Sequence, residues 1–306
     1  MTNASAMTAL QSLNATNKQL QQTQARISTG FRVADASDNA AYWSIATTMR
    51  SDNKANSVVQ DALGLGAGKV DTAYTAMNSA IDIIDDIKSK VLLAKTSSPE
   101  DRLKIQSEIK AYQDQLKDSI GGANYAGANL LQTDSGSTDT SLDVISSYNR
   151  TSTGAAVTGS ITIPYDNIRL IDTKTAGNAG ILDRNGSASG VSLLNIDLSA
   201  SGIASVTGTG DTAKFDNLLT DIEKVLADMT GAASELGAAK SRIDMQKDFV
   251  SKLMDSIDRG VGQLVDADMN QESTKLQALQ VQQQLGIQAL SIANANSQNI
   301  LALFKG

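Results

Sequence analysis

The sequence predicts a mainly α protein: a long, coiled-coil-like helical rod built from the N- and C-terminal segments, with a small β-containing central insert. Apolar side chains recur at spacings of three and four in residues 1–131 and 211–306, the period of helices that pack along one another. Aromatic residues make up only 4% of the chain and there are two prolines, which favours helices filled by aliphatic side chains. Residues 132–210 are instead rich in Ser, Thr, Gly, Asn and Asp.

The N-terminal segment is expected to be a packing helix, because its apolar residues keep one seam facing a neighbour. The residues of this seam are Ala6, Leu13, Leu20 and Ile27, seven apart, with Leu10 between them. The first charged residue is Lys18, so no positively charged leader precedes an apolar block and no cleaved signal peptide is expected.

A helical hairpin is expected next. Its first seam alternates spacings of four and three through Val70, Tyr74, Met77, Ile81, Ile84 and Val91. Ser98 can cap the second helix and Pro99 can occupy its first position, while Gly121 and Gly122 end it.

The longest seam runs from Phe215 to Leu264. At 1.5 Å per residue, roughly 50 residues make a helix of roughly 75 Å. A helix of that length cannot bury its own apolar face, so we expect it to lie along the hairpin in a bundle of three long helices.

The insert, residues 132–210, contains short β-type runs at 161–163, 168–171 and 191–198. Glycine-rich turns separate these runs, which predicts hairpins joined by surface loops. We expect the insert to project outward from the helices.

The C-terminal segment has no charged residue from Leu276 to Phe304, yet its apolar residues form two stripes along a helix. Ten Gln and Asn residues lie in this segment and would carry unpaired amides into a bilayer, so a membrane span is rejected. Two apolar stripes without charge indicate two contact faces on other protein. The candidate interface residues of both ends are Leu10, Leu13, Leu20, Ile27, Leu279, Leu285, Leu290, Ile292, Ile300 and Leu303.

Composition limits the chemistry. A net charge of −7 offers no basic patch for nucleic acid. The chain has no His and no Cys, so it lacks the commonest general base and metal ligand, and no catalytic, cofactor-binding or metal-binding residues are assigned.

Two motif-like runs are interpreted structurally. Gly64–Lys69 lacks the first glycine of a phosphate loop, which would fall at Leu63, and Val70 follows the lysine, so we interpret the run as a flexible helix joint. Asp266–Glu272 has Gln271 where a calcium loop needs glycine, and its carboxylates are better explained by a helix start.

Several runs resemble the signatures of bacterial flagellins, and their residues are most similar to those of alphaproteobacterial members. Near the N-terminus they are ISTGFRV at 27–33 and DASDNAA at 35–41. Near the C-terminus they are LGAAKSRI at 236–243, VDADMNQES at 265–273, QAL at 288–290 and NIL at 299–301. The resemblance covers residues 1–130 and 212–306 and leaves the insert unmatched.

The resemblance implies a structural, non-enzymatic subunit that polymerises into the flagellar filament for swimming. It implies export through the flagellar export apparatus with a chaperone, assembly under cap proteins, contact with hook-associated proteins, and an extracellular location. It also implies an inner terminal-helix domain (1–40 and 265–306), a long helical bundle domain (41–131 and 211–264) and a surface-exposed variable insert (132–210). The alternative is a hook–filament junction protein, which has similar ends.

Departures from the family pattern bear on host immune receptors. In the segment 25–46, which plant receptors read in many flagellins, Ser37 replaces the usual Lys, Asn39 an Asp, and Tyr42-Trp43 a Gly-Leu pair. In the helix 86–95, animal receptors pair with Arg, Arg and Glu, where this chain has Ser89, Val91 and Leu92. We expect weak recognition by both.

Overall fold

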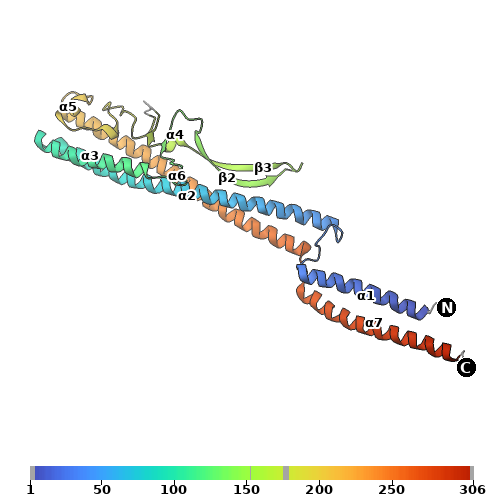
Figure 1. Ribbon diagram of the computed structural model, residues 1–306. Coiled ribbons are helices and arrows are strands. Elements are labelled where there is room, and N and C mark those ends of the chain that lie inside the picture. The colour runs from blue at the N-terminus through green and yellow to red at the C-terminus, as the bar shows by residue number, and fades with distance from the viewer. Residues whose placement is uncertain (1–3, 152, 175–178, 304–306) are drawn as a thin grey trace. The chain divides into compact units, whose positions relative to one another are not determined.

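The computed structural model describes residues 4–151, 153–174 and 179–303, and the chain is mainly helical, as predicted (Figure 1). Two compact units form. The terminal unit comprises Met1–Lys54 and Met254–Gly306, and the central unit comprises Ala55–Leu253. Each unit therefore combines segments that are far apart in the sequence.

The terminal unit contains α1 (Ala4–Thr29) and α7 (Met269–Leu303), which lie side by side and antiparallel (Figure 1). The start of α2 (Ala40–Thr96) and the end of α6 (Asp211–Val265) belong to the same unit. A small apolar cluster packs Val33, which precedes α2, and Ala46 of α2 against Val261 and Val265 of α6.

The central unit is built on α2, α3 (Pro99–Gly121) and α6, which confirms the three-helix bundle. Lys88 pairs with Glu223 at 3.0 Å and Arg102 pairs with Asp211 at 2.8 Å, so α6 runs beside both other helices. Ser98 caps α3 as predicted, because its side chain accepts a hydrogen bond from the Asp101 backbone N–H. Fully buried members of the core are Val70, Met77, Ile84, Val91, Ile109, Leu116, Phe215, Met229 and Leu236.

The insert forms one antiparallel hairpin and one short parallel pair. The hairpin joins β2 (Ser141–Arg150) to β3 (Ala156–Pro164), with a bulge between Ile145 and Ser147. The parallel pair joins β1 (Gln132–Thr133) to β4 (Ile171–Asp172). Two short helices, α4 (Tyr165–Ile168) and α5 (Ala200–Ser205), and a 3₁₀ turn at Leu193–Asn195 complete it.

The strand predicted at 161–163 is confirmed within β3, but the other two predicted runs are wrong. Ile168 ends α4, Ile171 begins β4 and the two residues between them belong to neither, while residues 191–198 contain the 3₁₀ turn. Residues 191–198 do not form a strand because of a contact with α3. The Gln113 side chain donates to the carbonyls of Leu193 and Ile196, each at 3.1 Å, so α3 takes the backbone groups that a strand partner would have used.

The insert is anchored on the helices by hydrogen bonds and close packing. The Asp221 carboxylate on α6 accepts backbone N–H bonds from Ala188 at 3.1 Å and Ser189 at 2.6 Å. A Cβ at Gly66 would lie 2.6 Å from a methyl carbon of Val144 in β2. Helix α2 is continuous through Gly64–Lys69, so the predicted flexible joint is wrong, and Gly66 is instead a site of close packing.

Candidate self-assembly surface

Helices α1 and α7 meet along one line of contact. In each helix, the less exposed residues recur at spacings of three and four, which keeps a single seam facing the partner. The α1 members are Ala6, Ala9, Leu13, Thr16, Leu20, Thr23 and Ile27, and the α7 members are Glu272, Leu276, Leu279, Gln283, Gly286, Leu290 and Ala293. Most of them are only half-buried, because each helix has one neighbour along this seam.

Polar contacts fix the alignment of the seam. The Gln283 amide donates to the Asn17 side-chain oxygen at 2.7 Å, and Arg26 pairs with Glu272 at 3.1 Å. The Glu272 side chain is nearly buried, so losing Arg26 would leave an unpaired carboxylate in the interface. A register slip would separate these groups, and the pairs therefore specify one antiparallel alignment.

The junction between α1 and α2 holds the end of α6. The Arg32 backbone N–H donates to the Val265 carbonyl at 2.6 Å, and the Arg32 guanidinium donates to the Leu264 carbonyl at 3.1 Å. These bonds satisfy carbonyls that a helix end leaves unpaired, and the cation lies at the negative end of the helix dipole. The ISTGFRV run thus positions the connections to α1 and α7.

Carboxylates at this junction act as turn and cap residues, as the sequence analysis predicted for the run that contains Asp268. Asp38 accepts the backbone N–H of Ala34 at 3.1 Å. Asp268 accepts that of Asn270 at 2.9 Å, at the start of α7. Among the residues that the structure describes, no group of three or more His, Cys, Asp or Glu is placed to hold a metal.

The structure divides eight of the ten candidate interface residues into two sets. Leu13, Leu20, Ile27, Leu279 and Leu290 lie in the seam between α1 and α7. Leu10, Leu285 and Ile292 are instead 46%, 59% and 63% exposed. Ile300 and Leu303 lie in the last turns of α7, and their side chains fall outside the described residues.

Three further exposed apolar residues belong with the second set. Val281 and Ile287 on α7 are 56% and 54% exposed, and Met7 on α1 is 60% exposed. Both α7 residues are members of the stripes seen in the sequence. Met7 was missed, although its position three residues before Leu10 places it on a neighbouring part of the same helix surface.

The electrostatics of these surfaces are unusual for helices that face water. Helix α1 contains only two charged residues, Lys18 and Arg26, and α7 contains none after Lys275. None of the described helices has the combination of length and apolarity needed to cross a bilayer. Exposed apolar side chains surrounded by amides and no charge fit contact with more protein.

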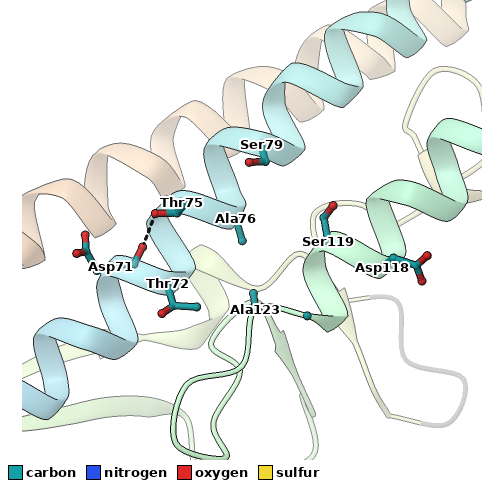
Figure 2. Close-up of a pocket in the computed structure, with 9 residues that line it drawn as sticks. Asp71, Thr72, Thr75, Ala76, Ser79, Asp118, Ser119 and Ala123 are labelled. Carbon is teal, nitrogen blue, oxygen red and sulfur yellow. Dashed lines mark hydrogen bonds between the residues drawn. The ribbon is translucent and has the colours of Figure 1, made fainter.

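A hollow in the central unit shows no arrangement of side chains that indicates a catalytic site. It has a volume of about 540 Å³ and lies between α2 and the end of α3. Figure 2 shows Asp118 turned away from Asp71, and Asp71 is paired with Lys240. The Thr75 hydroxyl donates to the Asp71 backbone carbonyl at 2.8 Å. These contacts lie within α2 and between α2 and α6, and they stabilise the helices.

Comparison with known proteins gives consistent matches at both ends. The model of the bacterial flagellin N-terminal helical region matches residues 1–136, and that of the C-terminal helical region matches residues 219–304. A flagellin of Brucella melitensis biotype 1 is 51% identical over 306 residues, covering 100% of this chain and 99% of the relative. Flagellin C of Rhizobium meliloti is 44% identical over 329 residues, covering 100% and 98%.

Among solved structures, one described as a flagellar hook-associated protein from Vibrio parahaemolyticus aligns with a TM-score of 0.52. The alignment covers 75% of this chain and 100% of that one, at 17% sequence identity. At this identity the likeness shows the fold alone.

Proposed function

The chain belongs to the bacterial flagellin family, and we propose that its terminal unit supplies the contacts through which filament subunits hold one another. The family is one of structural proteins, and this chain is a subunit of the extracellular flagellar filament that serves swimming motility. The relatives that cover the full chain are flagellins, and nothing favours the hook–filament junction alternative.

The observation that carries the proposal is the exposed, charge-free apolar surface of α7. Leu285 and Ile292 face away from α1 and have no covering element among the described residues. Burying each such side chain contributes about 1.5–3 kcal/mol. The eight candidate residues whose side chains are described then have two roles: the seam members hold α1 to α7, and the exposed members contact other subunits.

The rest of the assignment follows the family. Residues 1–40 and 265–306 form the inner domain of the filament, 41–131 and 211–264 form the long bundle, and 132–210 forms the outer, variable region. The chain has no catalytic role, in keeping with the lack of His and Cys. Its partners in assembly are the export apparatus, a chaperone, the cap and the hook-associated proteins. Cell fractionation of an export-deficient strain tests the route, since the chain should then stay inside the cell.

A single charge tests the proposed interface. Leu285→Asp should abolish filaments while leaving secretion and the monomer's fold intact, because Leu285 is exposed in the free subunit and buried in the filament. An unpaired carboxylate in a dry interface costs several kcal/mol, and the penalty recurs at every added subunit. Electron microscopy of purified protein after salt-induced polymerisation measures the outcome, with Leu285→Met as the uncharged control. Long filaments from the Asp variant would refute the proposal.

We also propose that host immune receptors recognise this flagellin weakly. In the helix 86–95, Ser89, Val91 and Leu92 stand where a receptor would pair with charged side chains. Leu92 is exposed and Val91 is fully buried. Each lost polar contact weakens binding by about tenfold or more. A dose–response assay should therefore require at least about tenfold more of this protein than of a strongly recognised flagellin. Equal potency would contradict the proposal.

A further inference from the structure

The loop from Gly186 to Ser189 holds the insert on α6 through a buried carboxylate. Asp221 is 8% exposed, and its oxygens accept the backbone N–H groups of Ala188 at 3.1 Å and Ser189 at 2.6 Å. A carboxylate that is taken out of water depends on such bonds for its stability. The position of this loop relative to Asp221 therefore decides how firmly the insert is held.

The loop favours glycine at position 186. A Cβ at Gly186 would lie 2.0 Å from Oδ2 of Asp221. A side chain at this position would thus displace the carboxylate from the N–H groups that hold it. The Gly186 backbone N–H also donates to the Val191 carbonyl at 3.1 Å, which closes the loop. Glycine at 186 is therefore part of the anchor.

The residue before this glycine is an asparagine, and the two form the single Asn-Gly pair of the chain. A glycine has no Cβ, so its backbone nitrogen can approach the Cγ atom of the preceding asparagine with little steric hindrance. Asn185 is exposed, lies outside the helices and strands, and makes no hydrogen bond to any residue that the structure describes. The bond from Gly186 to Val191 has to open before the two atoms meet, and it is a single bond between neutral groups in a surface loop.

We propose that Asn185 is a site of spontaneous deamidation, with water as the co-reactant, and that the reaction loosens the insert from α6. The Gly186 backbone nitrogen attacks Cγ of Asn185 and closes a succinimide ring. The side-chain nitrogen leaves as ammonia and takes the proton of the Gly186 N–H with it. Water then opens the ring at either of its two carbonyls, which gives aspartate or isoaspartate.

Both products act on the anchor. Each places a negative charge beside the glycine that contacts the buried Asp221, and like charges repel strongly where water is excluded. In isoaspartate the main chain also runs through the former side chain, which inserts a methylene group before Gly186. The N–H groups of Ala188 and Ser189 are then shifted from their places on the Asp221 carboxylate. The insert of an aged subunit is thus held less firmly than that of a newly made one.

Incubation of the folded, full-length chain at mildly alkaline pH tests the reaction. Trypsin cleavage after Arg184 and Lys214 then releases one peptide that contains both Asn185 and Asn195. Asn195 is an internal control, because it is also exposed but donates to the Ser192 hydroxyl at 2.9 Å and precedes a bulky residue. Mass spectrometry should record progressive loss of the amide at Asn185 while Asn195 stays intact.

Hydrogen–deuterium exchange tests the effect on the anchor. In the aged protein, the amides of Ala188 and Ser189 should exchange about tenfold faster or more than in fresh protein, since each loses a hydrogen bond to a charged group. Asn185→Gln is the matched control, because glutamine keeps a neutral amide but would have to form a larger ring, which closes more slowly. After the same incubation, this variant should exchange at the rate of fresh protein.

Several results would overturn the proposal. One is an Asn185 that stays intact in the folded chain but reacts when the chain is unfolded in urea, because the fold would then protect it. Another is loss of the amide at equal rates from Asn185 and Asn195. Unchanged exchange at Ala188 and Ser189 in the aged protein, or equally accelerated exchange in the incubated Gln variant, would show that the reaction does not loosen the anchor.

Discussion

At the scale of single residues, the glycines of α2 show that one residue type can have opposite physical roles within one turn of helix. Gly66 faces β2 so closely that a Cβ there would lie 2.6 Å and 2.7 Å from the two methyl carbons of Val144. A Cβ at Gly64 would have no neighbouring atom within 4 Å. Position in the helix, and not residue type, therefore decides what a substitution does.

This contrast gives a matched pair of predictions. Gly66→Ala should lower the free energy of unfolding by about 1–3 kcal/mol, because the new methyl group overlaps Val144. Gly64→Ala should raise it by about 0.5–1 kcal/mol, because alanine loses less backbone entropy in a helix. Urea unfolding followed by circular dichroism measures both. Equal effects of the two substitutions would show that β2 does not pack on α2 at Gly66.

At the scale of elements, the long helices could be predicted because the spacing of their apolar residues alone identifies the packing seams. The end of the first long helix and the start of α3 were also predictable, since Ser98 and Pro99 act through local geometry that needs no distant partner. The candidate surface was partly predictable for the same reason. Periodicity identified the apolar stripes of α7, but it could not say which stripe α1 covers.

The insert resisted prediction because its backbone bonds depend on residues far away in the sequence. The run at 191–198 has the composition of a strand, yet Gln113 binds two of its carbonyls and the Gln106 side chain accepts the Leu198 backbone N–H at 2.8 Å. The parallel pairing of β1 with β4 joins residues 132–133 to 171–172. Neither contact leaves a signal in local spacing, so only the fold reveals them.

At the scale of the whole molecule, the two compact units differ in how well each is packed. The seam between α1 and α7 is mostly half-buried, and its well-buried members include Thr16, Thr23 and Glu272, which contribute little apolar burial. The central unit instead buries a continuous row of aliphatic residues together with Phe215. Local opening is governed by such differences in buried apolar contact. The free subunit should therefore open its terminal unit well before its central unit.

Limited trypsin digestion tests this expectation at matched sites. Lys18 and Lys275 lie in the terminal unit, and Lys104 lies in α3 of the central unit, with all three side chains exposed. Exposure alone would make the three equally sensitive, but cleavage of a helix requires local unfolding. In dilute monomer, Lys18 and Lys275 should be cut much faster than Lys104, as mass spectrometry of the fragments would record. In assembled filaments the difference should disappear, because neighbouring subunits then cover the terminal unit. Cleavage of the monomer at equal rates would mean that α1 and α7 are stable without partners, and the exposed stripe on α7 would then lose its role in driving assembly.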